Sequence, residues 1–392
     1  MRKLLVICST LDLALPHSAT PWLWQLFKAL HELGCELIIM PYRGRAIRGL
    51  WWRCYENPCE LEGEAYAKLR GFFGYFSSKR NGSVRKYREG LTPRFARIIA
   101  LPKWKGRVRE IINKESDIEA VFFIQVPLNQ IRGLASSIRT EFGLPSFYYD
   151  TDVPLSLPEF GGLYFNHFPG ADLAEFEAFI IPSEGSVKRL IEMGAEKVFV
   201  LHFGVDPDVF SPIKAEYIID VFFSGGRFRN REESIKSLIA SPSKEMMDVE
   251  FVVSGRRFDV DLDLGNARYI PPIPFSSWRT YCCASRINLN IPRKNHALTN
   301  ATSTSRPFEL AAMKCCIVSS KYLGLEKWFD LSKEMLVAES AKEAIELYTW
   351  LLSDEEKRLK LGENAYRRIL KEHTAKSRAI ELLGFFDKTV KR

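Results

Sequence analysis

The pattern that decides the fold lies in residues 3–40, KLLVICSTLDLALPHSATPWLWQLFKALHELGCELIIM. The apolar run 3–8 predicts a buried strand. Thr20 and Pro21 then supply an N-cap and a first helical residue, and apolar residues from 23 to 33 recur at helical spacing. Gly34 ends this helix, and the apolar run 35–40 predicts a second buried strand. Such a β-α-β unit implies a parallel sheet that helices cover on both faces.

The same alternation of strands and helices continues along the chain. Further strands are predicted at 120–124, 146–150, 178–182 and 197–201, and a segment rich in Pro, Gly and Asp follows at 203–212. A second series begins with the strand 217–223 and continues with strands at 249–254, 267–270, 286–291 and 315–319. The sequence therefore predicts two Rossmann-like α/β domains that face each other across a cleft, at 1–205 and 206–370. We expect the last segment, 371–392, to be a helix that crosses back to the first domain.

The composition is that of a globular protein with a basic surface. Of the 392 residues, 46% are hydrophobic and 27% are charged, which excludes a disordered or fibrous chain. The net charge of +8 favours a polyanion, a phosphate ester or an anionic membrane as partner. No run approaches the roughly 20 apolar residues that span a bilayer. The eight cysteines form no C-x-x-C pair, which favours reduced thiols and a cytoplasmic location.

The first candidate anion site follows the strand 217–223 and reads Ser224-Gly225-Gly226-Arg227-Phe228-Arg229-Asn230-Arg231. Glycines at a strand end let backbone N–H groups approach an anion, and the next helix adds its positive end. The planar guanidinium groups of the arginines suit a diphosphate. A surface turn with solvated arginines is the alternative interpretation.

The second candidate segment is Arg306-Pro307-Phe308-Glu309. Pro307 begins a helix at the carboxyl edge of the predicted sheet, where open α/β sheets bind ligands. A carboxylate in its first turn, at Glu309, can accept both hydroxyls of a ribose, while Arg306 can reach a phosphate. Alternatively, Glu309 only complements the helix dipole.

These segments resemble the nucleotide-sugar domain of the GT-B group-1 glycosyltransferases, specifically their CgeB-like (spore maturation protein) branch. The resemblance covers roughly residues 148–385, and the matching stretches are Gly204-Val205-Asp206, Gly225–Arg231, Leu289-Asn290, Arg306–Glu309 and Lys371–Thr374 with Arg378.

The resemblance implies a GT-B glycosyltransferase that moves a sugar from a nucleoside-diphosphate sugar to an acceptor hydroxyl, with retention and without a metal or other cofactor. Domain 1–205 is then the acceptor side, and domain 206–370 holds the donor. Glu309 is expected to bind the ribose. The remaining expected donor-binding residues are Gly225, Gly226, Arg227, Arg231, Ser254, Ile270, Ser305 and Arg306. The chain departs from the larger family at Ala301, where a Glu is usual, and at Arg231, which replaces a Lys.

The acceptor side offers fewer signals. Asp152 follows the strand 146–150 and can orient or deprotonate an acceptor hydroxyl, although a turn-capping role explains it slightly better. His17 lies in the loop after the first strand, which is expected to line the cleft. We therefore expect Asp152, His17 and Arg231 to act in catalysis.

A basic tract lies between Lys79 and Arg109, where eleven basic residues and one acid give a net charge of +10. Basic residues beside aromatic rings fit an anionic membrane surface or a negatively charged acceptor, whereas a nucleic acid is disfavoured. A solvated insertion is the alternative. The residues expected at this surface are Trp51, Trp52, Arg85, Lys86, Arg88 and Trp104.

The sequence thus predicts a cytoplasmic enzyme, peripheral at the inner face of the membrane, with a glycan or lipid-linked acceptor. Two other functions stay open. One is a nucleotide-sugar epimerase of the same fold, and the other is a non-catalytic protein that binds a nucleotide or a membrane.

Overall fold

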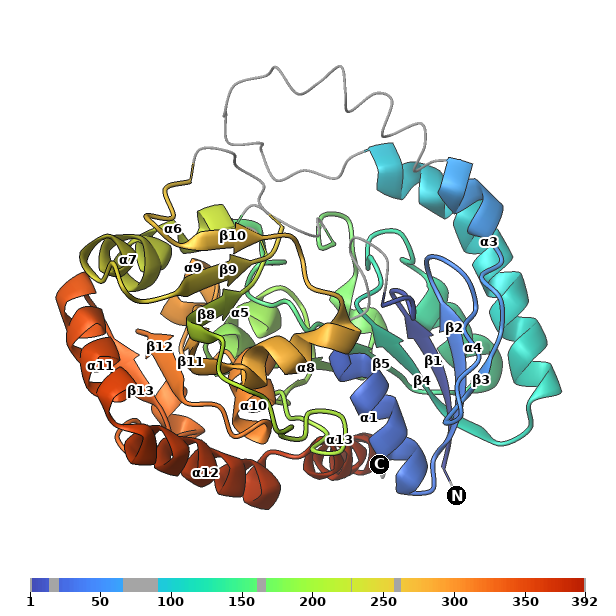
Figure 1. The fold of residues 1–392 in the computed structure, drawn as a ribbon. Helices are drawn as coiled ribbons and strands as arrows, with labels where there is room; N and C mark the ends of the chain where they lie inside the picture. The colour runs from blue at the N-terminus through green and yellow to red at the C-terminus, as the bar shows by residue number, and fades with distance from the viewer. Residues whose placement is uncertain are drawn as a thin grey trace. The chain divides into compact units, whose positions relative to one another are not determined.

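The computed structural model describes residues 2–13, 21–65, 91–160, 167–226, 228–256 and 262–390. The chain divides into two compact units, which are Met1–Leu201 with Ala379–Arg392 (unit 1) and His202–Arg378 (unit 2). Figure 1 shows a sheet in each of them. His17, Arg85, Lys86, Arg88 and Arg227 lie outside the described residues.

The sheet of unit 1 is parallel and has the strand order β3-β2-β1-β4-β5-β6-β7 among the described residues (Figure 1). Its strands are β1 (Lys3–Cys8), β2 (Glu36–Pro41), β3 (Arg53–Cys54), β4 (Ile118–Ile124), β5 (Ser146–Tyr149), β6 (Ala178–Ile181) and β7 (Val198–Val200). Its helices are α1 (Pro21–Glu32), α3 (Leu91–Lys114), α4 (Leu134–Phe142), α5 (Val187–Glu192) and most of α13 (Ala375–Val390), with short turns η1 (Pro158–Phe160), η2 (Leu173–Glu175) and η3 (Glu184–Ser186).

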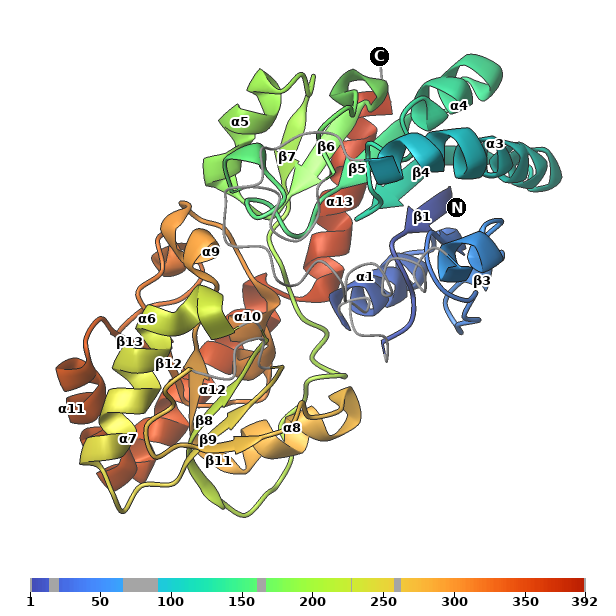
Figure 2. The same ribbon diagram turned by 90° about the horizontal axis from the view of Figure 1, so that it is seen from above.

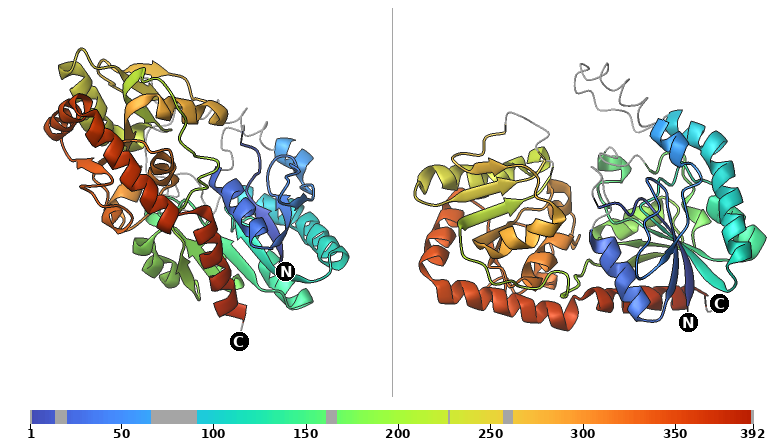
Figure 3. Two further views of the ribbon diagram at one scale, coloured as in Figure 1. Left: turned by 60° about the horizontal axis from the view of Figure 1, so that its bottom comes forward. Right: turned by 45° about the vertical axis from the view of Figure 1, so that its right-hand side comes forward.

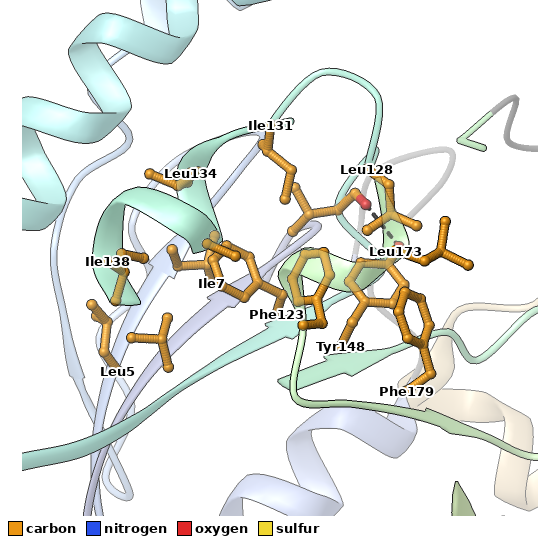
Figure 4. Close-up of a cluster of buried hydrophobic side chains, with 14 of the residues drawn as sticks. Leu5, Ile7, Phe123, Leu128, Ile131, Leu134, Ile138, Tyr148, Leu173 and Phe179 are labelled. Atoms are coloured by element: carbon orange, nitrogen blue, oxygen red, sulfur yellow. Dashed lines mark hydrogen bonds between the residues drawn. The ribbon is translucent and has the colours of Figure 1, made fainter. Parts of the chain in front are cut away.

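Alternate residues of these strands face opposite sides of the sheet, because successive side chains of a strand point in opposite directions. Leu5, Ile7 and Phe123 belong to one core cluster with residues of α3 and α4 (Figure 4). On the other face, the ring of Phe386 in α13 lies 5.4 Å from that of Phe122 and 4.3 Å from that of Phe147. Figures 2 and 3 show α1 and α3 on opposite sides of this sheet.

The sheet of unit 2 is also parallel, with the order β10-β9-β8-β11-β12-β13 in the described part of the chain. Its strands are β8 (Ile219–Ser224), β9 (Phe251–Ser254), β10 (Arg268–Ile270), β11 (Ser285–Asn290), β12 (Ile317–Ser320) and β13 (Leu336–Ala338). Its helices are α6 (Glu232–Ile235), the π-helical turn η5 (Lys236–Ala240), α7 (Ser241–Glu245), α8 (Phe275–Cys283), α9 (Lys294–Leu298), α10 (Ser305–Ala312), α11 (Ala341–Ser353) and α12 (Glu355–Glu372), with short turns η4 (Phe228–Arg231) and η6 (Leu325–Lys327).

Helices cover both faces of this second sheet as well. On one face, Tyr348 of α11 is fully buried and donates a hydrogen bond of 2.9 Å to the carbonyl oxygen of Leu238 in η5. On the other face, the ring of Tyr281 in α8 stacks on Phe222 of β8. Two Rossmann-like sheets and a C-terminal helix that packs on the first of them confirm the predicted fold class.

Two of the sequence motifs join the beginning of unit 2 to its end. The backbone N–H of Val205 donates to the carbonyl oxygen of His373 at 3.0 Å, and the guanidinium of Arg378 donates to Phe203. A Cβ atom on Gly204 would lie 2.9 Å from the carbonyl oxygen of His373, so this approach requires glycine. These motifs therefore have a structural role in closing unit 2.

Candidate functional site

The candidate donor site lies at the carboxyl edge of the unit 2 sheet. All the paired strands of this sheet run parallel, so the ends of β8, β9, β11 and β12 meet at one edge. The glycine loop follows β8, and α10 begins after the loop that leaves β11. Open α/β sheets bind their ligands at such an edge.

The glycine loop is tied to its neighbours by backbone and arginine hydrogen bonds. The N–H of Gly225 donates to the carbonyl oxygen of Ser254 at 2.9 Å, so it is already used within the sheet edge. Arg231 donates from Nε to the carbonyl oxygen of Ile291 at 2.7 Å and from Nη1 to that of Gly226. Arg231 therefore links the glycine loop to the loop after β11, which is a positioning role.

Glu309 is the fifth residue of α10 and so lies just beyond the first turn, in which the sequence had placed it, because the helix begins at Ser305 and not at Pro307. Only 5% of its surface is exposed. Its Oε2 is 3.5 Å from Nη1 of Arg306, whose guanidinium lies 4.1 Å above the ring of Trp278. Burial raises the pKa of Glu309, while Arg306 and a hydrogen bond from Ser305 oppose that rise. A buried carboxylate with one distant ion pair retains lone pairs for hydroxyl donors.

Buried polar atoms without a protein partner gather around this edge. Among the described residues they include Oδ1 of Asn290 at the end of β11, Oγ of Ser320 at the end of β12, and Nδ1 of His296 in α9. Each such atom costs about 1–3 kcal/mol when it stays unpaired, and such atoms are rare in folded proteins. These three atoms lie at or just after the carboxyl ends of neighbouring strands, where a ligand bound at this edge could pair with them.

His296 is a candidate site residue that the sequence analysis missed. Burial lowers its pKa well below the ordinary value, and the charges of Arg293 and Arg231 lower it further. The imidazole is therefore neutral at physiological pH and can donate one hydrogen bond and accept one. Its position in the loop that follows the predicted strand 286–291 was the signal available from the sequence.

The structure places the other predicted donor residues as follows. Oγ of Ser254 donates to the carbonyl oxygen of Pro271 at 2.9 Å, which joins the end of β9 to the loop after β10. Ile270 ends β10, the outermost strand in the described sheet, and is half-buried. Gly226 has no atom within 4 Å of an added Cβ, so its surroundings are open.

In unit 1, the buried acid at the end of β5 is Asp150 rather than Asp152. Asp150 is fully buried and accepts hydrogen bonds from the backbone N–H of Asp152 at 2.9 Å and from Oγ of Ser156 at 2.7 Å. Burial raises the pKa of Asp150 to about 6. The turn-capping role thus falls to Asp150, and Asp152 is half-buried in that turn.

The structure corrects the expected surface position of two tryptophans. Trp104 is only 1% exposed, and its ring lies 5.2 Å from that of Tyr42 inside the unit 1 core. Trp52 is 6% exposed and packs edge-on against Trp24. Both indoles are buried because their apolar area is worth more inside the core than on a wet surface. Trp51 is half-buried.

Other features of the molecule lie outside this site. A hollow of about 350 Å³ on unit 2 is lined by Lys333, Glu334 and α12 residues, but its central Arg368 already pairs with Glu334 and Glu372. The described residues contain no cluster of three or more His, Cys, Asp or Glu side chains suited to a metal ion. No helix in the described ranges is long and apolar enough to cross a membrane.

Known proteins resemble this chain in two ways: a family model matches part of its sequence, and solved structures match its whole fold. Residues 231–384 match the family described as glycosyl transferase-like. Sucrose-phosphate synthase from Thermosynechococcus elongatus is structurally similar over 99% of both chains, with a TM-score of 0.66 and 12% identity. A glycosyltransferase from Rickettsia africae has a TM-score of 0.59 and 12% identity, over 100% of this chain and 99% of that one.

The β-glucosyltransferase of phage T4, solved in complex with its UDP-glucose substrate, is similar over 100% of both chains, with a TM-score of 0.60 and 12% identity. No curated protein sequence matches this chain significantly. The whole chain therefore has the GT-B fold of these structures, and residues 231–384 match the family described as glycosyl transferase-like.

Proposed function

We propose that this protein transfers a sugar, with retention, from a nucleoside-diphosphate donor held by unit 2 to an acceptor hydroxyl. The observation that carries this proposal is the buried Glu309 paired with Arg306 in α10, on a sheet whose strands β11 and β12 end in buried polar atoms without a protein partner. We also expect membership of the CgeB-like branch, on the motifs quoted above.

In this proposal, Glu309 accepts hydrogen bonds from the two hydroxyls of the donor ribose. Arg306 and the N-terminal end of α10 hold the diphosphate, because backbone N–H groups and the helix dipole both favour an anion there. Arg231 keeps the glycine loop in position through its bonds to Gly226 and Ile291. Asn290 and His296 supply further polar contacts to the sugar or the phosphates.

The chemical step needs charge stabilisation more than a protein nucleophile. The acceptor oxygen bonds to the anomeric carbon as the bond from that carbon to the diphosphate oxygen breaks. The acceptor proton passes to the departing diphosphate when attack comes from the leaving-group side, which gives retention. Fixed arginines and helix N–H groups stabilise the negative charge that develops on the diphosphate. Asp152 and His17 remain candidates for orienting the acceptor.

Donor binding and turnover are tested together. The natural chain, Glu309→Ala and the exposed α11 control Glu346→Ala are incubated with nucleoside diphosphates and their sugars, beginning with UDP and UDP-glucose because the phage enzyme was solved with the latter. We expect a nucleotide-induced rise in Tm and release of nucleoside diphosphate in the natural chain and in the control only. At ligand 100 times above Kd, binding adds about 2.7 kcal/mol of stability, which is measurable.

Product analysis separates the alternatives. Conversion of the free donor to another nucleotide sugar, without release of nucleoside diphosphate, would favour the epimerase. Binding without turnover would favour the non-catalytic protein. Proton NMR of the first product decides the anomeric configuration, and repetition with a chelator tests the expected independence from metal.

We expect the acceptor to be reached at an anionic membrane surface. A patch on α3 exposes Phe95 by 54%, Ile98 by 73% and Ile99 by 50%. Exposed basic residues, Arg94 and Lys103, lie on the same helix. Apolar side chains beside basic ones fit a bilayer of anionic lipids, where each Lys or Arg adds about 1 kcal/mol.

Vesicle sedimentation tests this surface. The natural chain should sediment with phosphatidylglycerol vesicles and bind them less in high salt, and it should not bind phosphatidylcholine vesicles. The double variant Phe95→Ser with Ile98→Ser should lose this binding, whereas Ile218→Ser, which changes an exposed apolar residue of unit 2, should keep it. A natural chain that stays in solution with both vesicle types would remove the membrane from the proposal without touching the donor site.

A further inference from the structure

Four cysteines of unit 2 meet where α8 ends and β12 begins. Cys282 and Cys283 are the last residues of α8, and Cys315 and Cys316 directly precede β12. Sγ of Cys315 donates to the carbonyl oxygen of Cys282 at 3.7 Å, which places its thiol next to Cys283. The thiols of Cys283 and Cys315 shift each other's pKa in opposite directions. All four are free thiols. The fold thus holds two thiols together from positions more than thirty residues apart.

The two paired thiols differ in reactivity. Cys283 is half-buried, and the hydrogen bond from Cys315 lowers its pKa to about 7, with Arg279 acting in the same direction. Cys315 is buried, and the pKa of its thiol is raised by the same bond and by burial. Because the thiolate is the reactive form, Cys283 is the nucleophile of the pair and Cys315 the resolving thiol.

The neighbouring thiols do not compete. Burial raises the pKa of Cys282 well above its ordinary value and that of Cys316 to about 12. Both stay protonated at neutral pH and behave as small apolar side chains.

We propose that Cys283 and Cys315 form a reversible disulfide in the presence of a peroxide. The Cys283 thiolate attacks a peroxide oxygen, which gives a sulfenic acid and, after protonation, water. The Cys315 sulfur then attacks the sulfenic sulfur, loses its proton and releases a second water. In balance, two thiols and one hydrogen peroxide give one disulfide and two waters.

The disulfide between Cys283 and Cys315 has an expected effect on nucleotide binding, and this expectation rests on the proposed function. The last turn of α8 lies one turn beyond Trp278, whose ring supports the guanidinium of Arg306. The carbonyl oxygen of Cys282 also accepts a 3.0 Å hydrogen bond from Nδ2 of Asn288 in β11. We therefore expect oxidation to reduce the nucleotide-induced rise in Tm and a thiol reductant to restore it.

Peptide mass spectrometry tests the disulfide independently of nucleotide binding. The reduced full chain is treated with equimolar hydrogen peroxide, and remaining thiols are alkylated. We expect a linked peptide pair containing Cys283 and Cys315, its loss on reduction, and its absence in Cys283→Ser and Cys315→Ser. Cys316→Ser is the matched control and should still form the link, and its unfolding midpoint shows what a buried Cys→Ser change costs the fold.

Three results would overturn the proposal: a link between Cys282 and Cys283, over-oxidation of Cys283 to the sulfinic acid without a link, or no loss of the Cys283 thiol. If Cys315→Ser does not fold, the Cys283→Ser variant and the peptide map of the natural chain decide alone. A disulfide that forms in a chain that binds no nucleotide would leave this inference standing while the proposed function failed.

Discussion

Gly362 allows α12 to pack directly on Lys314, two residues after the end of α10, and its replacement by alanine should destabilise unit 2. A Cβ atom at this position would lie 2.0 Å from the carbonyl oxygen of Lys314 and 2.7 Å from its carbonyl carbon. Ordinary non-bonded heavy atoms stay about 3.5 Å apart, so the two backbones must separate by about 1.5 Å. The clash is with backbone, which cannot rotate away as a side chain can.

The contacts of Lys314 hold its backbone in place, so that it cannot easily move away from an added Cβ atom at position 362. Its backbone is in the left-handed region, with φ of 57°, and its N–H donates to the carbonyl oxygen of Ala311 at 3.0 Å. Its ammonium group also pairs with Glu363 at 2.8 Å. Overpacking of this kind costs about 1–3 kcal/mol, occasionally more, whereas alanine gains about 1 kcal/mol over glycine as a helix former. Because the clash is with backbone on both sides, the cost lies at the upper end of this range, about 3 kcal/mol, and we expect a net loss of about 2 kcal/mol.

Gly384→Ala provides the matched control. Gly384 also lies inside a helix, α13, but no atom is within 4 Å of its added Cβ. The propensity gain is therefore unopposed, and this variant should gain about 0.5–1 kcal/mol. Urea unfolding measures both variants, and each kcal/mol corresponds to about 2–4 °C in Tm for a unit of this size. If Gly362→Ala is as stable as Gly384→Ala, the inference that α12 packs against the backbone of Lys314 is wrong.

Three further predictions concern the candidate site and its support. Ala301→Glu should lower the free energy of unfolding by more than 2 kcal/mol, which is on the order of the cost of a buried unpaired charge. The reason is that Ala301 is fully buried with φ of 44° and its backbone lies against Gly324. A stable variant with higher turnover would show instead that this position only lacks the acid usual in the larger family. Glu309→Gln should weaken nucleoside-diphosphate binding by about 10- to 150-fold in calorimetry, since hydrogen bonds to a charged group are worth about 1.5–3 kcal/mol. Its Tm without ligand should not fall, because the variant removes a buried charge, and unchanged affinity would refute the ribose contact. Burial and Arg378 lower the pKa of His373 to about 4. In the unfolded chain this imidazole is protonated as the pH falls through about 6.5, whereas in the folded chain it is protonated only near pH 4. This contribution to the free energy of unfolding is present above pH 6.5 and is lost as the pH falls, by up to about 3 kcal/mol. Urea titrations at pH 7, 5.5 and 4.5 should show a smaller pH dependence of stability in His373→Gln than in the natural chain. An equal pH dependence in both chains would contradict the lowered pKa of His373.

The elements that the sequence predicted well are those with local signals. The predicted strand 3–8 is β1, and the helix expected from Pro21 is α1. The helix expected to begin near Pro307 is α10, but it begins two residues earlier, at Ser305, so Glu309 lies beyond its first turn. Hydrophobic periodicity and helix caps are properties of neighbouring residues, and a single sequence contains them in full.

The basic tract shows where local signals fail. Residues 91–114 form one helix, α3, which the sequence analysis did not predict because Pro102 and scattered charges interrupt its pattern. Trp104 was expected on a surface, yet it fills the core between α3 and the sheet. Whether an aromatic residue among basic neighbours is buried depends on what packs against it, and a linear pattern does not contain that partner.

The sequence by itself therefore determined the alternation of strands and helices, the two sheets, and the segments that make up the candidate donor site. Only the tertiary structure decided what each side chain does there. It made Arg231 a link between Gly226 and Ile291, brought the buried His296 beside that arginine, and paired Cys283 with Cys315. The physical reason is that backbone conformation follows short-range sterics and periodicity, whereas burial, hydrogen-bond partners and pKa values depend on contacts between residues far apart in the chain.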